Sequence, residues 1–194
     1  DRTQHMQMRV EGPSGERSRQ LTLYSRRNPS GEDRAVAFFE GPAEVKGVGF
    51  LEWIHPDRDN EQWLYLPSQR RVRQIATRGK DESFLGTDFT YRDLEVLGKV
   101  FTWSDDEAPA RLEREETVGD RRCWVVELRP EMAEMPYRRL LLWLDTQTAV
   151  LRRVEFFDKT DGEPVKRLTL DDFRDLRAIP TPHRLEMTQL TNGS

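Results

Sequence analysis

Few side chains in this sequence have the types and spacing from which site chemistry is built. The three histidines, His5, His55 and His183, lie far apart, and none has the short spacing of a zinc site. The single cysteine, Cys123, precedes the apolar run Trp124 to Val126, which favours a buried thiol, and it has no partner for an internal disulfide. The nucleophile motif Gly-x-Ser-x-Gly does not occur. We therefore predict no catalytic residue, metal ion or cofactor, and we expect the histidines at the surface or at strand ends.

Two other motifs resemble known sites but lack their context. The segment Lys46 to Gly49 is rich in glycine, yet a phosphate-binding loop opens a helix, and the residues that follow, Phe50 to Ile54, have a strand pattern. We interpret the glycines as a bend or bulge. The acidic runs Asp105 to Glu107 and Glu115-Glu116 lack the alternating ligands and central glycine of a calcium loop, so we expect them to be solvated.

A basic cluster follows the aromatic strand Trp63 to Leu66, and aspartates follow the cluster. Strand alternation places Arg71 and Arg73 on one face and Arg70 on the other. At least one arginine is therefore expected to meet a carboxylate from residues 81–95 and to hold that loop down as a latch. The alternative is contact with a ligand or a partner. The residues of this predicted latch are Arg70, Arg71, Arg73, Asp88 and Asp93.

Large apolar side chains form the second candidate set. They either line a cavity or form an ordinary core, and the residues alone leave both interpretations open. The candidates are Leu51, Trp53, Trp63, Tyr65, Phe84, Phe89, Leu141, Trp143 and Met187.

Alternation of apolar and polar residues indicates the elements that must position these side chains. Met6, Met8 and Val10 have the period of a half-buried strand, and turn residues separate them from the next strand. Asp161-Gly162 is a hairpin signal. Locally joined short strands predict an antiparallel sheet, as either a sandwich or a barrel. Later strands are predicted at 34–40, 48–55, 61–66, 70–76, 96–103, 110–118, 122–129, 137–145, 149–157, 165–173 and 183–190.

Two of the predicted strands, 63–66 and 140–144, are apolar on both faces. A strand of that kind needs cover on both sides. The one segment with helical spacing is 81–95, where Phe84, Tyr91 and Leu94 are suitably placed. We predict a loop with a short helix here, acting as a lid.

Composition and charge exclude other classes of protein. The 194 residues carry a net charge of -4, from 31 basic and 35 acidic residues, so no positive excess is present to bind nucleic acid. No stretch approaches the roughly 18 apolar residues that span a bilayer, and the first residues lack a secretory signal pattern. The length suits one domain, residues 1–194.

An ordered set of residues in the first half resembles a known family. The set resembles the outer-membrane lipoprotein-sorting proteins, the branch of LolA-like periplasmic carriers associated with exporters of the resistance-nodulation-division (RND) type. The resemblance continues more weakly through Tyr137, Trp143 and the stretch 166–177. The residues that carry it are Phe39, Pro42, Val45 to Gly47, Phe50, Leu51, Trp63 to Pro67, Arg70 to Arg73 and Ser83 to Phe89.

The resemblance implies a fold and a function. The expected fold is mainly β: an antiparallel, incompletely closed β-barrel of about 11 strands with a short helical or loop lid. The expected function is a periplasmic carrier that shelters the acyl chains of a lipoprotein or another lipid, working with an exporter or an outer-membrane acceptor. The nine apolar candidates would then line the cavity, and the arginines would contact a headgroup if they form no latch. The alternative functions are an exporter's accessory module without lipid and, less favoured, an enzyme acting on an envelope lipid.

Overall fold

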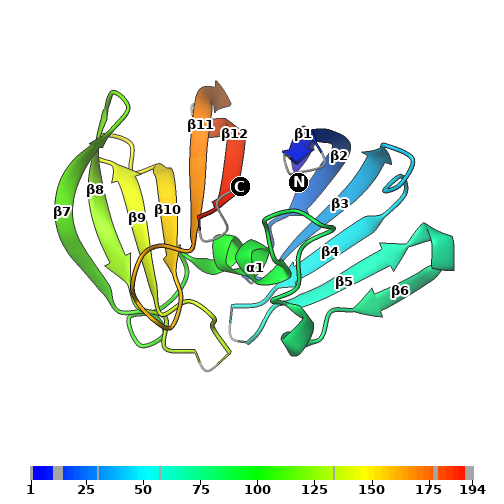
Figure 1. Ribbon diagram of the computed structural model, residues 1–194, viewed down its shortest axis with the longest axis horizontal. Coiled ribbons are helices and arrows are strands. Elements are labelled where there is room, and N and C mark those ends of the chain that lie inside the picture. The colour runs from blue at the N-terminus through cyan, green and yellow to red at the C-terminus, as the bar shows by residue number, and fades with distance from the viewer. Residues whose placement is uncertain are drawn as a thin grey trace. The chain divides into compact units, whose positions relative to one another are not determined.

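The computed structural model describes residues 2–10, 15–29, 31–56, 58–132, 134–176 and 179–190. These residues form two compact units, residues 1–102 and 103–194, and each unit is built on one six-stranded antiparallel sheet (Figure 1). Each strand pairs with its neighbour in sequence, so both sheets are meanders. The prediction of a mainly β, antiparallel fold is confirmed.

The first unit contains β1 to β6 in sequence order, together with the short 3-10 helices η1 and η2 and the helix α1. The bend predicted at Lys46 to Gly49 is present, because Gly47 has a φ of 81° and donates its backbone N–H to Phe39 O at 2.7 Å before β4 begins. The elements are β1 (Arg2–Val10), β2 (Arg17–Arg26), β3 (Asp33–Gly41), β4 (Gly49–Ile54), β5 (Glu61–Leu66), η1 (Pro67–Gln69), β6 (Arg71–Gln74), η2 (Thr77–Gly79) and α1 (Tyr91–Lys99).

The second unit contains β7 to β12, again in sequence order across the sheet. The predicted hairpin at Asp161-Gly162 connects β10 to β11, and Asp161 adopts a positive φ of 53°. The strands are β7 (Ala110–Val118), β8 (Arg121–Leu128), β9 (Arg139–Asp145), β10 (Leu151–Phe157), β11 (Lys166–Leu176) and β12 (Ile179–Gln189).

The helix α1 corrects one predicted strand. Residues 96–99 end this helix and a turn follows, so the strand predicted at 96–103 is wrong. The loop with a short helix predicted over 81–95 is present, with the helix beginning at Tyr91. A capping box explains the start: Thr90 Oγ1 accepts a hydrogen bond from Asp93 N at 3.1 Å, and Asp93 Oδ2 accepts one from Thr90 N at 2.7 Å. The cap outweighs the strand preference of Val96.

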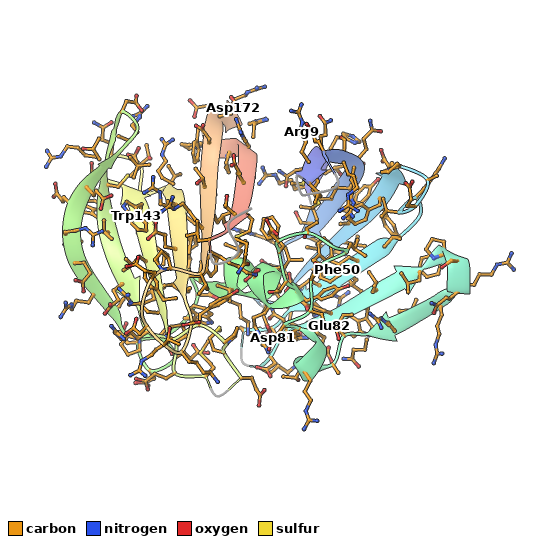
Figure 2. The ribbon with its side chains drawn as sticks, viewed as in Figure 1. Arg9, Phe50, Asp81, Glu82, Trp143 and Asp172 are labelled. Atoms are coloured by element: carbon orange, nitrogen blue, oxygen red, sulfur yellow. The ribbon has the colours of Figure 1, made fainter. Side chains whose placement is uncertain are left out.

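The first sheet has a covered face, which α1 and the loop before it pack against (Figure 1). Directly paired residues of neighbouring strands share a face, so Leu23, Ala37, Phe50 and Leu64 form one row across β2 to β5 on this side. Phe50 is labelled in Figure 2. These residues are buried or half-buried and form the core of the first unit.

The opposite side, the open face, is apolar as well. One row runs through Tyr24, Val36, Leu51 and Trp63, and a second row places Phe38, Gly49, Tyr65 and Val72 beside it. The strand at 63–66 is thus apolar on both sides, as the sequence indicates. Among the described residues, the cover forms on one side only.

The second sheet has one apolar face. A row of Val126, Leu142, Val154, Leu168 and Met187 crosses five strands without a polar side chain. Leu142, Val154 and Leu168 are buried in this row. The neighbouring rows of this face add Leu128, Leu140, Phe156, Leu144, Leu151, Leu170 and Leu185.

The other face of the second sheet, the arginine face, is mixed. Cys123, Val125 and Trp143 are buried there, and the Cys123 burial predicted from sequence is confirmed. Burial raises the pKa of this thiol, which keeps it protonated and unreactive. Arg153 and Arg114 extend over the Trp143 ring, at 5.2 and 6.0 Å from its centroid. Their aliphatic stems shield the apolar residues from water.

The predicted closure of the strands into a barrel concerns how the two sheets are connected. In the described residues the twelve strands, against about 11 predicted, form two sheets with no ladder between them. An incompletely closed barrel is therefore not confirmed and stays a prediction, as does the single domain. No helix in the described ranges is both long and apolar enough to cross a bilayer.

Candidate functional site

The cover of the first sheet consists of the loop 81–90 and α1. Phe84 anchors it: the Phe84 ring centroid lies 6.1 Å from that of Phe39, 5.1 Å from Phe50 and 5.4 Å from Tyr91. Arg19 on β2 donates a hydrogen bond to Leu85 O at 2.6 Å. The cover is thus fastened at its loop by an aromatic cluster and by one buried guanidinium.

A buried ionic network fastens the cover at its helix. Glu95 on α1 accepts from Lys80 Nζ at 2.8 Å and from Arg92 Nη1 at 2.9 Å, and all three side chains are almost completely buried. Lys80 also donates to Asn60 O at 2.8 Å, and the Asn60 N–H donates to Glu95 at 3.2 Å. Because the charges are paired and hydrogen-bonded, removing any one partner leaves the others in an apolar environment.

Glu52 extends this network onto β4. Its Oε1 accepts from Gln62 Nε2 at 3.0 Å and from Asn60 Nδ2 at 3.3 Å, while Gln62 also donates to Tyr91 O at 2.9 Å. Burial raises the pKa of the Glu52 carboxyl, against the opposing effect of the hydrogen bonds from Gln62 and Asn60. A titratable group therefore lies where the sheet meets the cover.

The open face carries a hollow of about 400 Å³ at one end. Apolar groups from three neighbouring strands, Tyr24, Val36 and Leu51, line it together with arginines. Arg34 also lies over the Trp53 ring, with its guanidinium carbon 4.0 Å from the ring centroid. The complete lining is Arg2, Thr3, Tyr24, Ser25, Arg26, Arg34, Val36 and Leu51.

Comparisons with known proteins identify the fold. A family model described as that of an uncharacterized protein matches residues 31–194, which is most of the chain. The chain belongs to this family. A comparison with curated proteins found no match.

Solved structures extend this result. A crystal structure described as an outer membrane lipoprotein-sorting protein domain from Vibrio parahaemolyticus matches with a TM-score of 0.87 and 26% identity, over 97% of this chain and 77% of that one. A DUF1329 family protein from Desulfovibrio piger also matches with a TM-score of 0.87 and 26% identity, over 96% and 78%. A LolA superfamily protein from Nitrosomonas europaea has the same fold at 17% identity and a TM-score of 0.71, over 98% and 79%. The resemblance to LolA-like, lipoprotein-sorting proteins is confirmed.

Within this LolA-like fold, the predicted latch residues lie around the cover. Arg71 and Arg73 share the covered face, as alternation predicts, and the charge of Arg73 acts on the Tyr91 side chain. Burial raises the Tyr91 pKa, and the nearby Arg73 opposes that rise. Asp93 caps α1, whereas Arg70 and Asp88 are exposed. Pairing of the arginines with Asp88 or Asp93 stays a prediction.

The predicted cavity residues of the first unit lie on two sides of its sheet. Leu51, Trp53, Trp63 and Tyr65 belong to the open face by register. Phe84 and Phe89 are part of the cover, whose hydrogen bond from Phe84 N to Phe89 O is 2.7 Å long. The first unit therefore does not bring these six side chains onto one surface.

The predicted residues of the second unit are divided too. Met187 lies on the apolar face, while Leu141 and Trp143, the latter labelled in Figure 2, lie on the arginine face. That these nine residues line one cavity stays a prediction.

Sequence reasoning missed the ionic network and the composition of the apolar face. The spacing of Arg92 and Glu95, three residues apart on a helix, was available as a signal once α1 was placed correctly. The alternation of Leu168 and Leu170 with the polar residues Arg167, Thr169 and Asp171 was a second signal, because it marks one face of β11.

His55 departs from the expected surface position, although it does follow the end of β4. Its side chain is fully buried, its ring lies 5.0 Å from that of Trp53, and its Nε2 is 3.2 Å from Glu61 Oε2. Among the described residues no group of three or more potential ligands is placed to hold a metal ion.

Proposed function

We propose that this protein is a periplasmic carrier that shelters the acyl chains of a lipoprotein or another lipid while they cross the cell envelope. The proposal includes an RND-type exporter or an outer-membrane acceptor as partner, and residues 1–194 acting as one LolA-like domain. The mechanism transfers cargo without making or breaking a covalent bond. Support comes from the similarity, at 26% identity, to a domain described as lipoprotein-sorting.

The observation that carries this proposal is the apolar face of the second sheet. A row of five side chains from five strands, Val126 to Met187 in chain order, presents only hydrocarbon and a thioether. Burying acyl carbon gains about 0.8 kcal/mol per methylene, so a chain of roughly fifteen methylenes is worth on the order of 12 kcal/mol before ordering costs. The row is an apolar surface of the kind that such a chain requires, and although Leu142, Val154 and Leu168 are buried, Leu185 on the same face is exposed.

The cover supplies the movable element in this proposal. It contacts the first sheet through Phe84 and through the network of Lys80, Arg92 and Glu95. A partner that stabilises an open form of the cover would uncover apolar residues of the first sheet and shift the population toward that form. Transfer then follows from differences in binding between two states.

The direct test is native mass spectrometry of protein purified from a host that supplies lipid. We expect a bound mass equal to one lipid or lipoprotein acyl group. In titrations with a fluorescent acyl probe we expect a stoichiometry of one to one. Protein that carries no lipid and binds no probe would contradict the carrier role and favour the accessory-module alternative.

Variants of β12 locate the acyl site. Leu185 lies on the apolar face and is 44% exposed, whereas the next residue, Glu186, belongs to the opposite face. Leu185→Gln is expected to weaken probe binding about tenfold, because it introduces a polar amide into the apolar surface. The matched variant Glu186→Gln should bind the probe as the unmodified protein does. Equal binding by the two variants would place the acyl chain elsewhere.

A further inference from the structure

The open face of the first sheet exposes large apolar side chains. Tyr24 and Phe38 each keep 45% of their surface exposed, and Val72 keeps 59%. Tyr24 and Phe38 are neighbours, and Val72 ends the row that runs from Phe38 across β4 and β5 to β6. Grouped apolar exposure of this kind marks an interaction surface.

The rings on this face are held in defined positions. Tyr24 and Phe38 meet edge to face with centroids 6.3 Å apart, and Trp53 lies 6.4 Å from Trp63. A Cβ on Gly49 would lie 3.1 Å from the Phe38 ring, so glycine at this position lets that ring lie across β4. Tryptophan and tyrosine combine an apolar body with a polar edge, which is why they are enriched at the lipid headgroup layer.

Arginines line one end of the same face: Arg26 and Arg34 belong to it by register, whereas Arg2 pairs with Ser25 and by register shares the other face. Arg2, Arg26 and Arg34 line the hollow of about 400 Å³, whose apolar lining includes Val36 and Leu51. Guanidinium groups bind phosphate oxygens through paired hydrogen bonds. The end of the open face thus combines phosphate-binding donors with an apolar floor.

The carboxylates of this face have partners of their own. Glu40 accepts a hydrogen bond from Thr22 Oγ1 at 2.6 Å, and Glu61 lies 3.2 Å from His55 Nε2 and 3.5 Å from Arg58. Among the residues that the structure describes, none of those lining the hollow is acidic. The described lining of the hollow therefore contains three arginines and no carboxylate, although the chain as a whole has a net charge of -4.

We propose that the open face of the first sheet docks onto an anionic phospholipid bilayer. The arginines of the hollow bind headgroup phosphates, and the neighbouring rings enter the headgroup layer. A bilayer fits better than a peptide, because the apolar groups extend over five strands, whereas a bound peptide uses a groove or a sheet edge. This docking is independent of acyl binding on the second sheet.

Flotation with vesicles tests the proposal. Vesicles of phosphatidylcholine containing phosphatidylglycerol should carry the protein, and vesicles of phosphatidylcholine alone should carry much less. Arg26→Gln and Arg34→Gln are each expected to weaken binding to the anionic vesicles about fivefold. Tyr24→Ser and Phe38→Ser are expected to weaken it about tenfold each.

Matched controls separate this surface from general stickiness and from the acyl site. Phe101 is 63% exposed in the same unit but lies outside the open face, so Phe101→Ser should float as the unmodified protein does. Leu185→Gln should also float normally, which separates docking from the proposed carrier role. Circular dichroism of each variant verifies that it is folded.

Three results with vesicles would overturn the proposal. They are equal binding to neutral and anionic vesicles, equal loss in Phe101→Ser and the open-face variants, and complete displacement from vesicles by inorganic phosphate at low concentration. The last result would indicate a site for a free anion. A protein partner that binds the open face while vesicles do not would likewise replace the bilayer as occupant.

Discussion

The two sheets differ in the face that lies opposite their main apolar face. In the first sheet both faces are apolar, one beneath the cover and one exposed, with Phe38 and Tyr24 among its exposed rings. In the second sheet one face is apolar, and the other buries Trp143 beneath Arg114 and Arg153. Arginine stems shield the apolar residues of the second sheet from water, whereas the exposed rings of the first sheet indicate a surface that binds a partner.

Equivalent truncations in the two sheets test this contrast most strongly. Phe156 on the apolar face is fully buried, and Phe38 on the open face is 45% exposed. Phe156→Ala should lower the free energy of unfolding by about 3–5 kcal/mol, because it leaves a cavity. Phe38→Ala should cost less than about 1 kcal/mol. Urea unfolding followed by circular dichroism measures both, and similar losses would mean that Phe38 is a core residue.

The ionic network beneath the cover gives the next largest effect. Glu95→Ala leaves Lys80 and Arg92 buried without their shared carboxylate, so we expect a loss of about 3 kcal/mol. Glu113, a half-buried carboxylate on β7 that pairs with the exposed Arg111, is the matched control, and Glu113→Ala should cost much less stability than Glu95→Ala. Amide hydrogen exchange across residues 81–99 should accelerate only in Glu95→Ala. Unchanged exchange there would mean that the network does not hold the cover.

The sequence predicts where the strands lie, but not which side chains of an apolar strand belong to which face of its sheet. Alternation at Met6, Met8 and Leu21 identifies strands correctly, because one face of each is polar. The run from Leu140 to Leu144 is apolar at every position, so alternation there gives no direction. Only the register shows that Leu142 joins the apolar face while Trp143 turns to the arginines.

Tertiary pairing explains the remaining differences. Lys80, Arg92 and Glu95 look like ordinary surface charges in the sequence, and their burial depends on the long-range approach of Asn60 and Glu52. A sequence pattern contains no information on that approach, which is why the predicted latch centred on a more conspicuous run of arginines.

A pH dependence sharpens the account of the covered face. Burial raises the Glu52 pKa in the folded protein above its unfolded value, so the folded state binds the proton more tightly. The stability from this proton is present below the unfolded pKa and is lost as pH rises through the folded pKa. The unmodified protein should therefore lose stability relative to Glu52→Gln as pH rises above the ordinary glutamate range. The total loss should be about 1.4 kcal/mol for each pH unit by which the folded pKa exceeds the unfolded pKa. Parallel curves for the two proteins, measured by urea unfolding, would contradict the raised pKa.

The smallest predicted effect concerns the two arginine-tryptophan pairs. Arg153 covers Trp143, which is 2% exposed, and Arg34 lies over the more accessible Trp53. If the stem of Arg153 is what shields its ring, Arg153→Ala should cost about 1 kcal/mol, and Arg153→Met should recover most of that loss.

On the open face the cation itself is expected to matter. Arg34→Ala and Arg34→Met should therefore lose similar amounts, about 0.5–1 kcal/mol, because neither retains a charge over the Trp53 ring. Denaturant unfolding of the four variants gives the comparison. The opposite result would be that methionine restores stability at position 34 but not at position 153. In that case the charge of Arg153 stabilises the second sheet and the packing of the Arg34 stem stabilises the first, which reverses the difference drawn between the two faces.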